Sequence, residues 1–360
     1  MKRNYGIDCL RLVLMFMIVV LHVLGHGELL DSVERLGTKY MVLWLLETFG
    51  FCAVNCYALV SGYVHYESKY RLASLAMLYL QVLLYSLGIG IMGWILRPEW
   101  FSISKMIAFL FPVSKSVYWY ASAYVGLFLL IPVLNAGVNA LSRSVLERML
   151  VLAFVLFSAV PMAFRGGGDA FGLGGGYSLF WLMLLYIVGA YIRKYEVGRD
   201  LKPVKAFLVY GACVLVSWGT KMAAEYLISW YTGEPTRIGG LVSYISPTMV
   251  FAAVFLFLCF KNAAIPGKLQ KAIAVFSPAA FGVYLIHDHE YFRGAVIAGT
   301  FTFWTDHSVP VMVVGTLATA ALIFAACILV DSLRLVVFKK LRLKEKLEAL
   351  EQKLFEKYSM

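Results

Sequence analysis

The first apolar stretch of the chain carries three polar residues whose spacing places them on one side of a helix. The stretch covers residues 6–27 and contains Asp8, Arg11 and His22. Arg11 and His22 are eleven positions apart, which in a helix is about three turns plus 20°, or about 16 Å along the axis. Asp8 precedes Arg11 by three positions and shares its face. A charge within a membrane span costs about 2.5 to 3.5 kcal/mol and is by default a functional candidate. The alternative is that Arg11 and His22 only reach toward the two interfaces.

A second group of ionisable residues lies late in the sequence. The segment FGVYLIHDHEYFRG places His287, Asp288, His289, Glu290 and Arg293 within seven positions. Such groups suit general acid–base catalysis, although a capped turn between two helical pieces would explain them equally well. The His-x-His pair with a following carboxylate is a weak zinc pattern, because no third His can be located. We therefore expect no metal site.

Polar residues also interrupt a second apolar segment, LLETFGFCAVNCYALVSGYVHYESKYR. Glu47, Asn55 and Ser61 lie within it, and Lys69 and Arg71 follow directly. Glu47 is predicted to lie toward the outer end of this span, where it is a candidate for orienting His22. All of these positions are costly for polar groups in a membrane, which makes them secondary site candidates.

Two further features have simpler explanations. The segment VYWYASAYVGLFLLIPVLN begins with aromatic residues that include Trp119 and Tyr120, and an aromatic belt at the membrane interface accounts for them. Lys221 and Glu225 are one helical turn apart and are predicted to form a mutual ion pair.

The composition is that of an integral membrane protein. Hydrophobic residues make up 61% of the 360 residues and charged residues 15%, and the mean hydropathy is +0.78, outside the range of soluble domains. A bilayer core needs about 20 apolar residues per helix. The chain is therefore predicted to be an all-α polytopic protein with ten spans, at residues 7–25, 40–63, 72–96, 117–137, 145–164, 177–192, 204–230, 241–260, 272–303 and 309–337. The segment LIHDHEYFRG interrupts the ninth span, and the alternative is that this span is two shorter pieces.

Basic residues predict the orientation of these spans. Of the Lys and Arg residues outside the predicted spans or at their ends, 22 fall on the side that holds both termini and eight on the other. Because basic residues accumulate in cytoplasmic loops, both termini are predicted to be cytoplasmic. The net charge of +11 then indicates contact with anionic lipid rather than with nucleic acid.

We expect two parts in the chain. Residues 1–338 form the transmembrane domain, and residues 339–360 form a cytoplasmic amphipathic tail helix that lies along the inner leaflet, pairs with a neighbour or is simply solvated. A Gly-rich segment, residues 165–176, is expected to be a flexible external loop, and a mobile cover over an external site is the alternative.

Several segments together resemble acyltransferase family 3, multi-span enzymes that O-acylate cell-surface glycans. The Arg followed after ten residues by His in the first span is one of them. The others are similar to the branch that modifies exopolysaccharides and occur in the expected order: AVNCYALVSGYV, LYLQVLLYS, YWYASAYVGLFLLIPVLN, SYISPTMVF and FGVYLIHDHEYFR. One departure is His-Asp-His at residues 287–289, where His-Asp-Asn is expected, which leaves the role of His289 open.

The resemblance implies a membrane O-acetyltransferase in the plasma or inner membrane. It would move an acyl group from cytoplasmic acetyl-CoA to a hydroxyl of an exported polysaccharide or lipid-linked glycan. His22 would be the general base, Arg11 would position the donor with Arg71 and Ser61, and Asp8 would orient Arg11. Asn55, Trp119, Tyr120, His287, Asp288 and Arg293 would bind the acceptor or polarise the reacting oxygens.

Two other functions fit the same buried residues. A transporter for a small polar solute would use Arg11 and His22 to bind substrate or relay protons, and a sensing module would use them to bind a ligand. Transporters often have matching interrupted helices in two halves, and no such match is visible by eye. The sequence leaves the acceptor sugar, the acyl chain length and the oligomeric state open.

Overall fold

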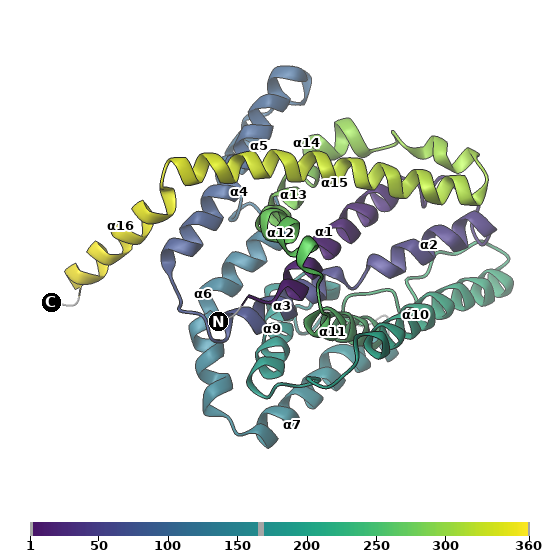
Figure 1. The fold of residues 1–360 in the computed structure, drawn as a ribbon. Helices are drawn as coiled ribbons and strands as arrows, with labels where there is room; N and C mark the ends of the chain where they lie inside the picture. The colour runs from purple at the N-terminus through teal and green to yellow at the C-terminus, as the bar shows by residue number, and fades with distance from the viewer. Residues whose placement is uncertain (1–2, 165–168, 359–360) are drawn as a thin grey trace.

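The described part of the chain folds into helices joined by turns and loops. The structure is a computed structural model and describes residues 3–164 and 169–358. No strand occurs in these residues, so the predicted all-α class is confirmed (Figure 1). The α-helices are α1 (Tyr5–Gly25), α2 (Thr38–Gly50), α3 (Ala53–His65), α4 (Leu72–Leu96), α5 (Ile103–Leu110), α6 (Trp119–Ala140), α7 (Arg143–Phe154), α8 (Val160–Ala163), α9 (Leu179–Lys194), α10 (Pro203–Thr232), α11 (Pro247–Asn262), α12 (Gly267–Phe276), α13 (Ala280–His287), α14 (Glu290–Phe292), α15 (Val309–Lys340) and α16 (Leu343–Tyr358).

Most of these helices are apolar enough to enter a bilayer. Within the described ranges, eight helical segments qualify by length and composition: Tyr5–Gly25, Thr38–His65, Leu72–Leu96, Trp119–Ala140, Arg143–Ala163, Pro203–Thr232, Gly267–His287 and Val309–Lys340. The two other predicted spans correspond to shorter helices, α9 and α11. The protein is a multi-pass membrane protein, and the number of crossings stays a prediction.

Two predicted spans contain breaks. The span at 40–63 corresponds to the membrane-length segment Thr38–His65, within which the chain turns at Phe51 and Cys52 between α2 and α3. The ninth predicted span, 272–303, is divided: the helical run is Gly267–His287, and from Asp288 onward short helical turns lead to α15. Hydropathy measures the length of an apolar stretch and does not locate a bend within it.

The helix α1 lies in the middle of the bundle (Figure 1). The apolar part of α1 is 61% buried, against 11% for Arg143–Ala163 at the periphery. Around α1 pack α2, α3, α11, α13 and α15. Asn4 fixes its start, because the Asn4 side chain accepts hydrogen bonds from the backbone N–H groups of Gly6 and Ile7. Such an N-cap satisfies backbone donors that have no partner within the helix.

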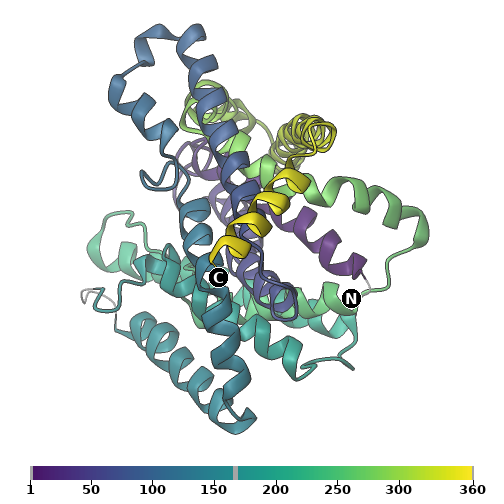
Figure 2. The ribbon, with the colours of Figure 1, turned by 90° about the vertical axis from the view of Figure 1, so that its left-hand side faces the viewer.

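Both ends of the described chain lie at the same end of the bundle (Figures 1 and 2). We call this the inner end and the opposite one, where α1 finishes, the outer end. The sequence predicts the inner end to be cytoplasmic, and this stays a prediction. Arg334, counted above among the basic residues of the predicted cytoplasmic side, is part of α15 and is paired with the buried Asp331.

The tail helix α16 packs against the start of α4. Glu351 accepts hydrogen bonds from the backbone N–H groups of Leu72 and Ala73 at 2.8 and 3.0 Å. Arg71 pairs with Glu348 at 2.5 Å. Carboxylates at a helix start satisfy free N–H groups and interact favourably with the helix dipole. Of the three environments considered for the tail, the structure shows pairing with a neighbouring helix.

Candidate active site

A cavity of about 370 Å³ opens beside the outer half of α1. We call it the outer cavity. Its walls come from α1, α2, α3, α6, α13 and the loops between helices, and eight of the 18 lining residues are aromatic. The lining residues are Met15, Ile18, Leu21, His22, Gly25, His26, Glu47, Phe51, Val54, Tyr57, Trp119, Tyr120, Tyr177, Tyr244, Phe281, Tyr284, Asp288 and Arg293. Six of the residues predicted for the site therefore share one cavity: His22, Glu47, Trp119, Tyr120, Asp288 and Arg293.

A chain of hydrogen bonds fixes the protons on His22 and His287. The Nδ1 of His287 lies 2.6 Å from the Val283 carbonyl oxygen, which can only accept, so this nitrogen carries the proton. The Nε2 of His287 is then an acceptor for the Nδ1–H of His22, 3.0 Å away. In the neutral ring this leaves the Nε2 of His22 with a free lone pair. His22 is thus arranged to take up a proton at Nε2.

Asp288 lies where it can stabilise the charge that His22 would gain. Its Oδ1 is 3.5 Å from the Nδ1 of His22, 3.5 Å from Arg293 and 3.9 Å from His26. By ligand type, His22, His26 and Asp288 could hold a metal ion. However, Arg293 already places a positive charge on the same carboxylate oxygen, and the Nδ1 of His22 donates to His287. The arrangement is better suited to proton transfer than to binding a second cation.

His287 is predicted to act as a positioning residue for His22. His287→Leu removes the acceptor for the Nδ1–H of His22, while Asp288 remains nearby as a weaker partner. We expect acyl transfer to fall about 10-fold, with little change in the KM for the acyl donor. His287→Gln keeps an acceptor oxygen and should restore most of the rate. If both variants lose activity to the same extent, the residue matters only for packing.

A second cavity, of about 470 Å³, lies at the inner end of α1. We call it the inner cavity. It is lined by Arg3, Asn4, Ile7, Asp8, Arg11, Tyr63, Val64, Arg193, Ser277 and Pro278. Asp8 bridges two of the guanidinium groups, at 2.5 Å from Arg3 and 3.2 Å from Arg11. With three arginines and one carboxylate, the inner cavity is strongly basic and suits an anionic group.

Tyr57 lies between the two cavities. Its side chain lines the outer cavity, and its hydroxyl donates to the backbone oxygen of Arg11 at 2.6 Å. The polar edge of α1 therefore faces cavities inside the protein along its whole length.

The outer wall includes two loop tyrosines, Tyr177 and Tyr244. Tyr177 follows the Gly-rich segment, of which residues 165–168 lie outside the described residues. Gly176 has φ +103, and a Cβ there would lie 2.4 Å from Tyr244. Only glycine fits this backbone. The last residues of the Gly-rich segment thus hold Tyr177 against Tyr244, with ring centres 4.9 Å apart.

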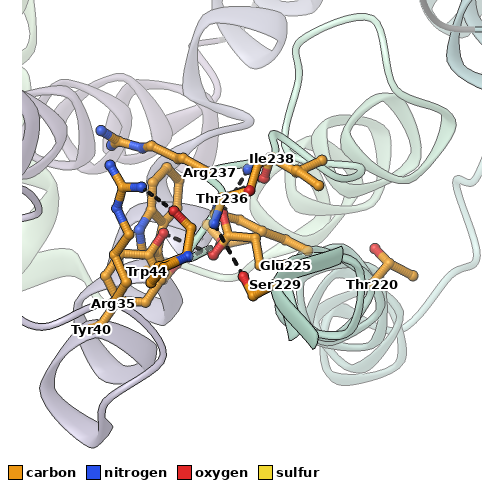
Figure 3. A network of polar contacts seen from close by, with 12 residues as sticks. Arg35, Tyr40, Trp44, Thr220, Glu225, Ser229, Thr236, Arg237 and Ile238 are labelled. Atoms are coloured by element: carbon orange, nitrogen blue, oxygen red, sulfur yellow. Dashed lines mark hydrogen bonds and ion pairs between the residues drawn. The ribbon is translucent and has the colours of Figure 1, made fainter. Parts of the chain in front are cut away.

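The predicted ion pair between Lys221 and Glu225 is confirmed, and it holds the loop that carries Tyr244. Glu225 accepts hydrogen bonds from the hydroxyl of Tyr40 at 2.8 Å and from the N–H of Ile238 at 2.9 Å. Lys221 donates to the Ile238 oxygen at 2.7 Å. Figure 3 shows Glu225 on its helix between Tyr40 and the loop residues Thr236 to Ile238. The pair therefore has a structural role at the outer end.

Comparison with known families agrees with this arrangement. The profile of the acyltransferase 3 family, described as an acyltransferase domain, matches residues 4–331. The chain belongs to the acyltransferase 3 family. No significant match was found among curated proteins or among solved structures. The match covers every residue predicted for the site and every residue that lines the two cavities except Arg3, so this family member is a membrane acyltransferase.

Four of the predicted site residues lie outside the two cavities. His287 lies behind His22, as described above. Asn55 is buried and binds the Tyr244 oxygen at 2.8 Å and the Trp181 indole at 3.0 Å. Ser61 donates to the backbone oxygen of Tyr57. Arg71 lines a separate cavity of about 380 Å³ at the inner end, with His65 and Lys69 among its neighbours.

His289, whose role the sequence left open, does not reach the outer cavity. Its Nδ1 accepts from the N–H of Tyr291 and its Nε2 lies 3.1 Å from the Ser86 oxygen. Its neighbour Glu290 pairs with Lys105. His287 and His289 therefore face different partners and cannot share a metal ion.

Several lining residues were missed by sequence reasoning. His26 is one helical turn after His22, and this spacing could have indicated it. Arg3 and Arg193, in the inner cavity, were taken only as loop charges. Tyr177 and Tyr244 lie in loops, where no periodic pattern exists to identify them.

Proposed function

We propose that this family member transfers an acetyl group from acetyl-CoA, bound at the inner end, to a hydroxyl of an exported polysaccharide or lipid-linked glycan in the outer cavity. The observation that carries the proposal is the hydrogen bonding of His22, which leaves its Nε2 free. This residue has a free Nε2 in an aromatic cavity, on the same helix that brings Arg11 into a basic cavity. One element thus connects an anion-binding end to a proton-accepting end.

The inner cavity would bind the phosphate-bearing end of the donor. Arg3, Arg11 and Arg193 supply guanidinium groups, which form paired hydrogen bonds with phosphate oxygens. Asp8 keeps Arg11 in place. Lys69 and Arg71 line the separate cavity of about 380 Å³ at the inner end, and they would add positive charge there. The donor's thin pantetheine arm would extend about 16 Å along α1 toward His22. Ser61 would support α3 beside this path, since its hydroxyl donates to the backbone oxygen of Tyr57.

The transfer itself would need only groups that line the outer cavity. The Nε2 of His22 takes the proton from the acceptor hydroxyl as its oxygen attacks the thioester carbonyl carbon. Asp288 stabilises the positive charge on His22, and Arg293 stabilises the negative charge that develops on the carbonyl oxygen. The C–S bond then breaks, and the leaving thiolate takes the proton from the Nε2 of His22. The products are an ester and free coenzyme A.

The decisive experiment is transfer by the purified protein in lipid nanodiscs. Acetyl-CoA labelled in the acetyl group would be supplied with the source cell's own exported polysaccharide, stripped of esters by mild alkali. We expect label in alkali-labile esters on the polysaccharide, and equal amounts of free coenzyme A. Free coenzyme A without labelled ester would contradict the glycan acceptor. The absence of both labelled ester and free coenzyme A would contradict acetyl-CoA as the donor.

A further inference from the structure

Glu47 is the one carboxylate of the outer cavity that the mechanism does not use. It lies on α2, is 8% exposed, and lines the cavity. Its Oε2 is covered and has no hydrogen-bond partner among the described residues. No hydrogen bond joins it to His22 within this part of the chain, and the Nδ1 of His22 already has His287 as its partner. The predicted role of Glu47 in orienting His22 therefore has no contact to support it.

The nearby cations are directed elsewhere. Lys221 is bonded to Glu225 and to the Ile238 oxygen, and Arg237 pairs with Asp31. Both cations also lie over the Trp44 ring, at 3.7 and 5.1 Å from its centre. Figure 3 shows Arg237 beside Trp44. Neither cation hydrogen-bonds to Glu47 in the described part of the chain, so the Oε2 of Glu47 is left free to accept a hydrogen bond.

A buried carboxylate oxygen without a partner destabilises the folded protein. In a cavity, such a group can be satisfied by a ligand that supplies the missing donors. The ligand must therefore bring hydrogen-bond donors to a position deep in the outer cavity.

The cavity wall beside Glu47 has the character of a sugar-binding surface. Trp119, Tyr177, Tyr244 and Phe51 form a continuous series of rings, with successive centres 4.6, 4.9 and 4.7 Å apart. The series ends at Phe51, which follows Glu47 by one helical turn. Aromatic faces pack against the apolar C–H face of a sugar ring, while a carboxylate accepts hydrogen bonds from its hydroxyls.

We propose that Glu47 anchors the acceptor by binding hydroxyls of its sugar. The sugar unit packs on the rings of Tyr177 and Tyr244, donates hydroxyl hydrogen bonds to Glu47, and thereby holds another hydroxyl at the Nε2 of His22. This inference rests on the proposed function, because it assumes a glycan acceptor.

Glu47→Ala and Glu47→Gln, in the nanodisc assay above, test the assignment. We expect Glu47→Ala to raise the KM for the de-esterified polysaccharide about 10-fold or more, and Glu47→Gln to have a smaller effect because one acceptor oxygen remains. The slow hydrolysis of acetyl-CoA without acceptor should be unchanged in both variants, and so should the KM for acetyl-CoA. Glu34→Gln, at an exposed acidic residue of the same outer side, is the matched control and should behave as wild type.

Three outcomes would overturn the proposal. An unchanged acceptor KM would show that Glu47 does not contact the acceptor. A parallel loss of acceptor-independent hydrolysis would show that Glu47 acts on His22 or the donor instead. If the wild-type protein hydrolyses acetyl-CoA but transfers nothing to the polysaccharide, the proposed glycan acceptor is contradicted. This failure appears in the wild-type protein, whereas a failure of the Glu47 assignment alone appears only in the variants.

Discussion

Replacing His22 by alanine is expected to lower acyl transfer by about 10² to 10⁴-fold, the usual contribution of a positioned general base. The free Nε2 of His22 is the group in the outer cavity that the hydrogen bonds of His287 leave ready to accept a proton. Without it, the acceptor hydroxyl must lose its proton to water. The KM for acetyl-CoA should change little, because the phosphate-binding arginines lie at the other end of α1.

The measurement is ester formation on the polysaccharide, normalised to the amount of folded protein in the membrane. His307→Ala is the matched control, since His307 is exposed on the outer side and its imidazole lies against Phe303 and Trp304, away from the outer cavity lining. It should retain full activity. Full ester formation by the His22→Ala protein would reject His22 as the base.

Replacing Asp331 by alanine is expected to destabilise the folded protein by about 3 to 5 kcal/mol, because it leaves a buried charge without its partner. Asp331 is 0% exposed. It binds Arg334 through both of its oxygens and accepts hydrogen bonds from Gln81 and Tyr85. Gly282 makes room for it, since a Cβ there would lie 2.0 Å from the carboxyl group. The network joins α4, α13 and α15.

Thermal unfolding in detergent would measure this effect. The Asp331→Ala protein should unfold at a markedly lower temperature and accumulate less in the membrane. Asp306→Ala, at an exposed residue, is the matched control. The folded fraction of the Asp331→Ala protein should keep its kcat, because Asp331 lines neither cavity. An unchanged melting temperature would contradict the importance of the pair.

Asp331 also illustrates what hydropathy cannot predict. The last predicted span contains this carboxylate, yet its mean hydropathy is high enough to hide a single charge, and Arg334 was counted only among the basic residues of the cytoplasmic side. The two residues are three positions apart, so a helical pair could have been anticipated. The contacts of Asp331 with Gln81 and Tyr85, some 250 positions earlier in the chain, could not have been anticipated.

The spans themselves follow from local physics. A backbone in hydrocarbon must satisfy its own hydrogen bonds, so long apolar segments become helices wherever they occur. For this reason the predicted segments all correspond to helices, while the turn at Phe51 was missed and the end of α13 at His287 was left as one of two alternatives. Those two boundaries depend on which neighbours each segment packs against.

The sequence by itself determined that the chain is an all-helical membrane protein and that Asp8, Arg11 and His22 share one edge of α1, because helical periodicity is a local property. Only the tertiary structure decided what meets that edge. It brought His287, 265 positions away, to the Nδ1 of His22, and it placed Tyr177 and Tyr244 in the cavity wall. It also directed Asn55 and Arg71 to structural partners. Contacts between segments far apart in the chain depend on how the helices pack, and no single segment contains that information.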